Sequence, residues 1–264
     1  MKFFFFVVAG LLSISLSGVA HADWSFGIGT GLFRLNVDGD MGFDIEYDNI
    51  GPVEFDVDLD PDDVDDVMET AFGFGGYATD GKWMIQYSYG MLELEDDSSV
   101  VLPSDAPLHP GATVSSELGF DMTGGEITVG YPIYEDTTLI VRLHAGVRYT
   151  DHELDHDVRI DGGAPVQSKD IDEDWTDALV GISAGVPFAE KWTWNNKFNA
   201  GFGGSEGTYF AQTGITWRFL KHWSASLYGK YTAVEYENGS RGDSDWYLYD
   251  VDEFGLGIGV LFNW

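Results

Sequence analysis

Residues 139–149, Leu-Ile-Val-Arg-Leu-His-Ala-Gly-Val-Arg-Tyr, decide the fold class because large apolar side chains occupy every second position. The odd-numbered positions are all apolar or aromatic, whereas the even-numbered ones include Arg142, His144 and Arg148. Successive side chains of a β-strand point to opposite faces. The stretch therefore predicts a strand of about ten residues with one apolar and one polar face.

The same period of two recurs along the chain, and short connections alternate with long ones. An even number of strands brings both ends of such a sheet to the side of the short turns. Closure into a barrel satisfies every backbone group within lipid and leaves no edge strand. We therefore predict an all-β, antiparallel up-and-down transmembrane β-barrel of about ten strands, with eight as the alternative. The ten predicted strands are 24–35, 70–79, 82–94, 118–131, 138–150, 175–188, 191–202, 208–219, 222–236 and 250–264.

A soluble β-sandwich would show the same alternation, so the ends of the segments matter. Their apolar faces carry aromatic side chains beside the tight turns, which is how girdles at membrane interfaces appear in a sequence. The predicted girdle comprises Trp83, Trp192, Trp194, Trp217, Trp223 and Trp264.

Three stretches near the C-terminus, 199–205, 214–219 and 223–231, combine alternation with glycine and aromatic residues. They resemble the small outer-membrane β-barrels of Gram-negative bacteria, which are OmpA-like or porin-like in their transmembrane region. The last strand, which ends at Trp264, resembles the signal read by the barrel-assembly machinery, although Phe is the usual last residue there. The resemblance implies an outer-membrane location and, as partners, outer-membrane lipid, lipopolysaccharide and that machinery.

The first 22 residues predict a cleaved signal peptide that exports the chain. Met1-Lys2 is a short basic region, residues 3–16 are apolar, and Ala20-His21-Ala22 supplies the cleavage pattern. Residues 23–264 would then form the barrel. Its long outer loops are predicted at 36–70, 95–117, 151–174 and 238–250.

The charge and the missing cysteines exclude several classes of protein. The chain of 264 residues carries 13 Lys and Arg against 45 Asp and Glu, a formal charge of −32, which argues against nucleic acid as a partner. With no cysteine there is no disulfide, no Cys-ligated metal and no thiol nucleophile. The acid is expected to lie mainly in the outer loops.

If the apolar faces meet lipid, the opposite faces line the lumen. Because a small barrel has an interior only wide enough for side chains, we expect ion pairs to plug it. A selective path for solutes is the alternative. The predicted lumen-lining polar residues are Glu126, Arg142, His144, Arg148, Lys197, Arg218, Lys230 and Glu253.

The segment 36–70 has 14 acidic residues and no Lys or Arg, and 60–68 within it predicts a short helix capped by Asp60. Asp56, Asp58 and Asp60 are weak candidates for a calcium site. An EF-hand loop would need Gly and Glu where this chain has Pro61 and Val67. We therefore expect no cofactor beyond loosely bound divalent cations.

Residues 152–156, His-Glu-Leu-Asp-His, match the zinc motif HExxH. The chemistry requires both histidines on one helical turn, with the Glu as general base. Because this motif directly follows a predicted strand, His152 and His156 would lie ~13 Å apart. They are accordingly weak metal candidates.

The sequence as a whole favours a non-enzymatic outer-membrane barrel with a filled polar lumen, acidic surface loops, and a structural, adhesive or envelope role. A narrow channel for small anionic solutes is the first alternative. The second is an outer-membrane hydrolase of the omptin or lipid A-modifying kind, for which His144, His152 and His156 would be the candidate acid–base residues.

Overall fold

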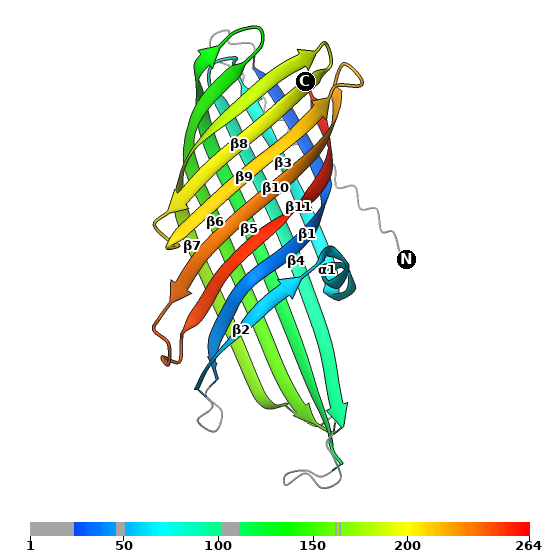
Figure 1. The fold of residues 1–264 in the computed structure, drawn as a ribbon, viewed down its shortest axis with the longest axis vertical. Helices are drawn as coiled ribbons and strands as arrows, with labels where there is room; N and C mark the ends of the chain where they lie inside the picture. The colour runs from blue at the N-terminus through cyan, green and yellow to red at the C-terminus, as the bar shows by residue number, and fades with distance from the viewer. Residues whose placement is uncertain (1–23, 46–50, 102–110, 162, 164) are drawn as a thin grey trace, which may run out of the picture.

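A computed structural model describes residues 24–45, 51–101, 111–161, 163 and 165–264 of the chain. The predicted signal peptide, 1–22, lies outside the described residues. Nearly all of the described chain forms one antiparallel sheet that closes on itself (Figure 1). Within the described residues, no α-helix has the length and apolarity that a membrane-spanning helix needs.

The sheet has eleven strands, and consecutive strands from β3 onward pair with one another. Pairing of β11 with β1, from Gly27–Asn263 to Phe43–Tyr247, closes the ring. In the described chain β2 pairs with β1 and stands outside the ring, so ten strands close it, as predicted. The elements are β1 (Ser25–Ile45), β2 (Gly51–Leu59), α1 (Pro61–Val67), β3 (Met68–Thr79), β4 (Met84–Val101), β5 (Thr113–Glu135), β6 (Ile140–Ile160), β7 (Pro165–Ala189), β8 (Trp192–Phe202), β9 (Gly207–Trp217), β10 (Trp223–Asn238) and β11 (Tyr247–Asn263).

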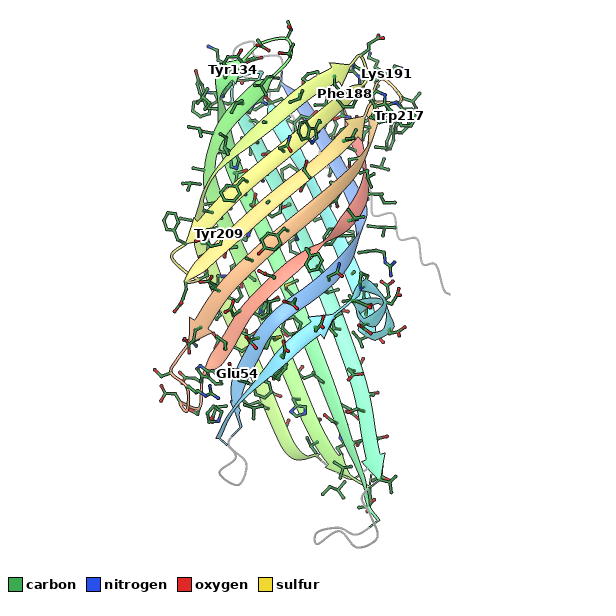
Figure 2. The ribbon with its side chains drawn as sticks, viewed as in Figure 1. Glu54, Tyr134, Phe188, Lys191, Tyr209 and Trp217 are labelled. Carbon is green, nitrogen blue, oxygen red and sulfur yellow. The ribbon has the colours of Figure 1, made fainter. Side chains whose placement is uncertain are left out.

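The outer surface of the ring carries an apolar band. On β6 the outward side chains are those of the odd-numbered positions. From 141 to 149 they are all apolar or aromatic, whereas the next outward residue is Asp151. Ten residues of a tilted strand rise ~25 Å, the height of the apolar band of outer-membrane barrels. The six tryptophans of the predicted girdle are between 39% and 55% exposed, and Trp192 stacks on Trp217 with ring centroids 5.5 Å apart. Figure 2 shows Phe188 and Trp217 close together at the end of the barrel with short turns.

Beyond the band the strands continue, so the long loops predicted at 95–117 and 151–174 are wrong for the described residues of these segments, which leave out 102–110, 162 and 164. β4, β5, β6 and β7 run through most of both segments. Their outward positions become acidic, but their inward positions stay apolar, as Leu154 and Trp175 show. The alternation that makes a strand amphipathic therefore persists past the membrane. Likewise, the predicted loop 36–70 contains half of β1, all of β2, and α1, and the loop predicted at 238–250 shortens to 239–246.

Outside the band the wall divides into two facing sheets. β8 and β9 stop early, and β1 pairs with β3 only from Ser25 to Thr30. One sheet is therefore made by the outer parts of β4, β5, β6 and β7, and the other by those of β1, β2, β10 and β11. Figure 1 shows these two groups reaching separate tips.

Between the two sheets lies a hydrophobic core that fills the outer half of the lumen. The ring of Trp175 stacks on that of Tyr236 with centroids 4.1 Å apart, which joins β7 to β10 across the interior. The buried members of the core are Met41, Phe43, Leu154, Trp175, Val234, Tyr236, Tyr247, Tyr249 and Val251. A buried aromatic side chain removes roughly 150–250 Å² from water, so this core anchors the outer sheets.

Helix α1 confirms the helix predicted at 60–68. The Asp60 carboxylate accepts hydrogen bonds from the backbone N–H groups of Asp62 (2.8 Å) and Asp63 (3.2 Å), and Asp63 caps Asp60 in return. Val64, which is 4% exposed, fixes the helix to the wall. On the exposed side Arg34 of β1 donates to Asp62 at 2.6 Å, a surface pair of small energetic value.

Candidate functional site

At the level of the membrane, a cluster of charges around Glu126 of β5 fills the lumen. Glu126 accepts hydrogen bonds from Arg148 Nη2 of β6 at 2.7 Å and from Lys197 Nζ of β8 at 2.6 Å. The three side chains are only 10%, 14% and 19% exposed, respectively. Both cations also lie 5.6 Å from the centre of the Phe210 ring, within the range of cation–π attraction. One carboxylate thus holds two cations from different strands across the interior.

The cluster extends to His144 through Asn199. Asn199, 1% exposed, donates to Glu126 Oε1 at 3.3 Å, and its own carbonyl oxygen meets His144 Nε2. This contact requires Gly181, because a Cβ there would fall on His144 Nε2 and on the Phe198 carbonyl oxygen. The lumen is therefore packed with mutually bonded polar groups at this level.

A second ion pair lies between this cluster and the aromatic core. Lys230 Nζ of β10 stands 3.7 Å from Glu253 Oε2 of β11, and the Lys230 cation lies 5.3 Å from the Phe33 ring centre. Tyr249 donates to Glu253 Oε1 at 3.3 Å, which links the pair to the core. The polar and apolar fillings of the lumen are therefore continuous.

The structure places the predicted lumen residues on inward positions, with one exception. Arg142 is half-buried on the inner face of β6, towards the short-turn end. Arg218 was predicted to line the lumen, and this is wrong. β9 ends at Trp217, so Arg218 lies exposed in the following turn, where its Nη2 donates to the Glu190 carbonyl oxygen at 3.4 Å.

The structure adds a fully buried carboxylate that the sequence analysis did not single out. Asp177 of β7 is 0% exposed and accepts four hydrogen bonds from the turn between β8 and β9 and from the start of β9. The donors are the N–H groups of Gly204 (3.1 Å) and Ser205 (2.8 Å) and the hydroxyls of Ser205 and Thr208, both at 2.8 Å. Asp177 therefore ties the short connection between β8 and β9 to the wall. The only sequence signal was an acid between the apolar inward positions Trp175 and Leu179.

His152 lies in the middle of the aromatic core and is 1% exposed. Its Nδ1 is 3.0 Å from Tyr247 Oη, and the rings of Trp175 and Tyr249 approach it edge-on with centroids at 4.8 and 4.6 Å. Its Nε2 has no hydrogen-bond partner among the described residues. His156 points elsewhere, with its Nε2 at 2.9 Å from Ser116 Oγ. His152 and His156 therefore do not converge on a metal.

Burial of His152 predicts a stability that depends on pH. Burial lowers the pKa of His152 to about 3, whereas an unfolded histidine titrates near 6.5. Below pH 6.5 the unfolded chain binds a proton that the folded protein cannot take, so stability falls with falling pH. We expect this histidine to cost about 2 kcal/mol of unfolding free energy between pH 7 and pH 5.

The measurement is urea unfolding of the membrane-reconstituted protein at both pH values, for the wild type and His152→Gln. The Gln variant should lose the part of the pH dependence that His152 contributes. An unchanged difference between the two pH values would show that His152 is accessible to protons in the fold.

Outside the membrane band, the outer face of the sheet β4–β7 carries carboxylates directly opposite one another. Strand pairing places Glu93, Asp121, Glu153 and Asp172 in one row across four strands. Asp155 opposes Asp170 in the next row, and partial burial together with Asp170 raises the pKa of Asp155. Like charges that face each other across strands are destabilising. These rows therefore oppose folding and stand out as candidates for a binding role.

The sheet on the other side repeats this arrangement. One row contains Asp56, Asp40, Asp250 and Glu235, from β2, β1, β11 and β10. Beside it, Asp58 and Asp252 flank Asp38 of β1. Much of the acidic charge of the described chain thus lies on the outward faces of strands, beside that of α1 and of the turns.

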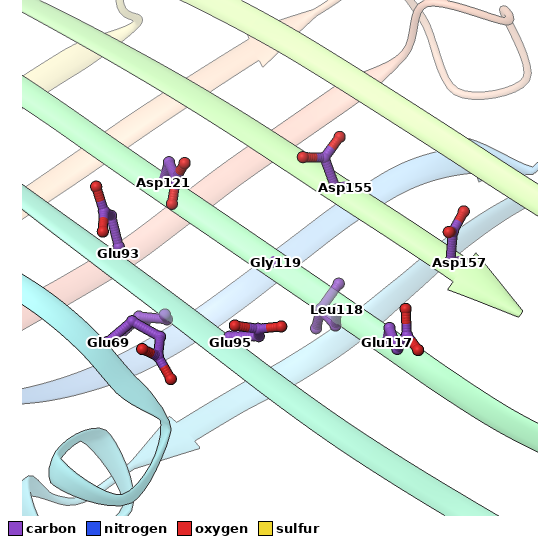
Figure 3. A pocket seen from close by; sticks show the side chains of 10 residues that line it. Glu69, Glu93, Glu95, Glu117, Leu118, Gly119, Asp121, Asp155 and Asp157 are labelled. Atoms are coloured by element: carbon purple, nitrogen blue, oxygen red, sulfur yellow. The ribbon is translucent and has the colours of Figure 1, made fainter.

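A shallow depression of about 320 Å³ lies at Gly119 on the outer face of the sheet β4–β7 (Figure 3). Gly119 has no side chain there, and Glu95 and Asp155 flank it on the neighbouring strands. Seven carboxylates line the depression, spread over four strands, namely Glu69, Glu93, Glu95, Glu117, Asp121, Asp155 and Asp157.

The described residues contain no group of three or more His, Asp or Glu side chains that could hold a metal ion. This applies to the calcium candidates as well. Asp56 and Asp58 point outward from β2, whereas Asp60 is engaged as the N-cap of α1. The acidic faces are therefore suited to diffuse attraction of cations rather than to a closed metal site.

No protein-family model and no curated protein sequence matches the chain. Among solved structures, the outer membrane protease OmpT from Escherichia coli is similar with a TM-score of 0.58 and 7% identity, covering 94% of this chain and 99% of that chain. The translocator domain of the autotransporter NalP from Neisseria meningitidis has a TM-score of 0.46 and 10% identity, with coverages of 94% and 90%. The fold is that of Gram-negative outer-membrane β-barrels, which confirms the predicted fold class.

Proposed function

We propose that this protein is a non-enzymatic, non-conducting barrel of the outer membrane that presents two acidic faces for adhesion to cationic partners. The observation that carries the proposal is the set of opposed carboxylate rows on the outer sheets. A row such as Asp56, Asp40, Asp250 and Glu235 costs folding energy, and a cationic partner would relieve that cost.

The filled lumen supports a role other than transport. At membrane level the interior holds the ion pairs of Glu126, and beyond it the aromatic core closes the same path. An anion would have to displace both fillings. We therefore expect no unitary current from the purified protein in planar lipid bilayers. Discrete openings at physiological salt would contradict a non-conducting barrel and favour the anion channel.

The positions of the histidines support a non-enzymatic role. His144 lies at membrane level, His152 inside the aromatic core, and His156 beside Ser116. Within the described chain, these three side chains do not share one cleft with an acid. Hydrolysis of lipid A or of basic peptides by the purified protein would contradict this part of the proposal.

The location and the membrane partners belong to the same proposal. The pattern of residues 1–22 supports export by a cleaved signal peptide. The apolar band supports contact with outer-membrane lipid, and the resemblance supports insertion by the barrel-assembly machinery through the last strand. Lipopolysaccharide would approach the acidic rows next to the band. Loosely bound divalent cations would bridge its phosphates to the carboxylates.

The adhesive role can be tested with a simple cation. We expect nanodisc-embedded protein to bind hexalysine at low salt and to release it as salt rises, because exposed charges are screened. Asp40→Asn combined with Asp250→Asn should weaken this binding. The matched control, Glu135→Gln with Glu190→Gln, removes the same charge at the short-turn end. No binding by the wild type, or equal losses in both pairs, would contradict the proposal.

A further inference from the structure

β2 presents a strand edge that no described strand covers. It pairs with β1 from Ile45–Gly51 to Val37–Leu59, and no other described strand pairs with it. β4 pairs with β3 only as far as Met68–Leu94, so its residues 95–101 pair with β5 alone. Helix α1 intervenes where β2 would otherwise continue into β3. The wall that is closed within the membrane is thus open beside β2.

The backbone groups and side chains of β2 determine what kind of ligand could bind along this edge. Unpaired backbone N–H and C=O groups of an edge strand accept an extended peptide as an additional strand. On the inner side, Phe55 and Val57 pack against the core but remain partly exposed. On the outer side, Glu54, Asp56 and Asp58 are exposed. An added strand would therefore meet apolar groups on one face and carboxylates on the other.

The protein itself places a guanidinium at this edge. Arg241, from the loop between β10 and β11, donates through Nη1 to Glu54 Oε2 at 2.6 Å. The same guanidinium lies 5.7 Å from the centre of the Trp246 ring. A basic side chain therefore fits against the outer face of β2.

We propose that β2 takes up an extended segment of a partner protein in which apolar and basic residues alternate. This inference rests on the adhesive function proposed above and names its partner class and mode. Opposite charges on directly opposed residues stabilise a strand pair, and backbone hydrogen bonds supply affinity that does not depend on sequence. β2 has nine residues. An antiparallel strand added to it would form about four residue pairs that each exchange two backbone hydrogen bonds.

The same acidic residues disfavour a second copy of the chain. In an antiparallel pair of two β2 strands, carboxylates would face carboxylates, which is unfavourable. The edge is thus protected against self-association and remains open to a basic strand.

The test uses synthetic nine-residue peptides with nanodisc-embedded protein and measures fluorescence anisotropy. A peptide of alternating Val and Lys should bind at least tenfold more tightly than one in which the same residues form two blocks. N-methylation of every second residue removes the N–H groups on one edge of the peptide strand. One of the two N-methylated forms should lose tenfold in affinity, and the other less than threefold.

Variants of the protein locate the binding site. Asp56→Asn with Asp58→Asn should weaken binding of the alternating peptide at least tenfold. The control pair Glu153→Gln with Asp172→Asn removes the same charge from the other face and should change affinity less than threefold. Both pairs leave the described hydrogen bonds of the core untouched.

The outcomes separate this inference from the function on which it rests. Equal binding of both N-methylated forms, or equal effects of both variant pairs, would overturn strand addition while leaving cation binding intact. Failure of every lysine peptide, hexalysine included, would overturn both. Dimers of the protein that the alternating peptide cannot displace would assign the edge to a second copy and overturn the inference.

Discussion

Replacing Glu126 by alanine should lower the free energy of unfolding by about 3–5 kcal/mol, because Arg148 and Lys197 would remain buried without their shared counter-charge. Both cations are less than one-fifth exposed, so water cannot fully replace the carboxylate. The expected result is a lower urea midpoint in lipid vesicles with little change in slope. When samples are heated to a series of temperatures before electrophoresis, the variant should shift to the unfolded position on the gel at a lower temperature than the wild type.

Two further variants separate charge from packing at this site. Removing all three charges, with Glu126→Leu, Arg148→Met and Lys197→Met, should recover most of the loss, because a fully replaced ion cluster leaves no unpaired charge. Glu135→Ala removes an exposed carboxylate from the same strand and should change stability by less than about 0.5 kcal/mol. If Glu126→Ala behaves like this control, water occupies the lumen and the barrel is not plugged.

The part of the fold within the membrane could be predicted because its signal is local. The alternation at 139–149 decides which side chains face lipid and which face the lumen, and a strand keeps that period whatever its partners are. Glu126, Arg148 and Lys197 could therefore be assigned to the interior. That they contact one another depends on barrel closure and register, which brings β5, β6 and β8 together at one height.

The outer sheets differ from the predicted loops because their outward acidic residues are equally typical of loops. The inward positions kept their apolar alternation through Leu154, Ile171 and Trp175, and this signal was present in the sequence. The prediction that Arg218 lines the lumen is wrong because the alternation does not continue to this residue. It lies one residue past the end of β9, where the backbone turns and the two-residue period no longer applies.

Other features depend on contacts that sequence reasoning cannot supply. His152 meets Tyr247, a residue 95 positions further on, only because β11 closes the ring. The open edge of β2 arises from the insertion of α1, which the sequence indicated only as a short helix in a loop. No local pattern specifies which strand loses its partner.

Asp177 is the second site at which we expect a large effect, because it satisfies four donors without being exposed at all. Asp177→Ala would leave those donors facing a cavity within the wall. Each buried donor without a partner costs about 1–3 kcal/mol, and partial rescue by water brings the expected total loss to about 4 kcal/mol. Urea unfolding in vesicles measures this loss directly.

The location of the effect distinguishes a turn anchor from a general packing residue. Asp177→Ala should expose the turn at 203–206 to proteolysis before the barrel unfolds, because two of the lost bonds hold the backbone N–H groups of Gly204 and Ser205. Asp177→Asn retains one acceptor oxygen and should lose about half as much stability. Asp174→Ala, on the exposed face of the same strand, is the control and should change neither property. Uniform destabilisation of Asp177→Ala without early cleavage at the turn would show that the carboxylate supports the whole wall rather than this connection.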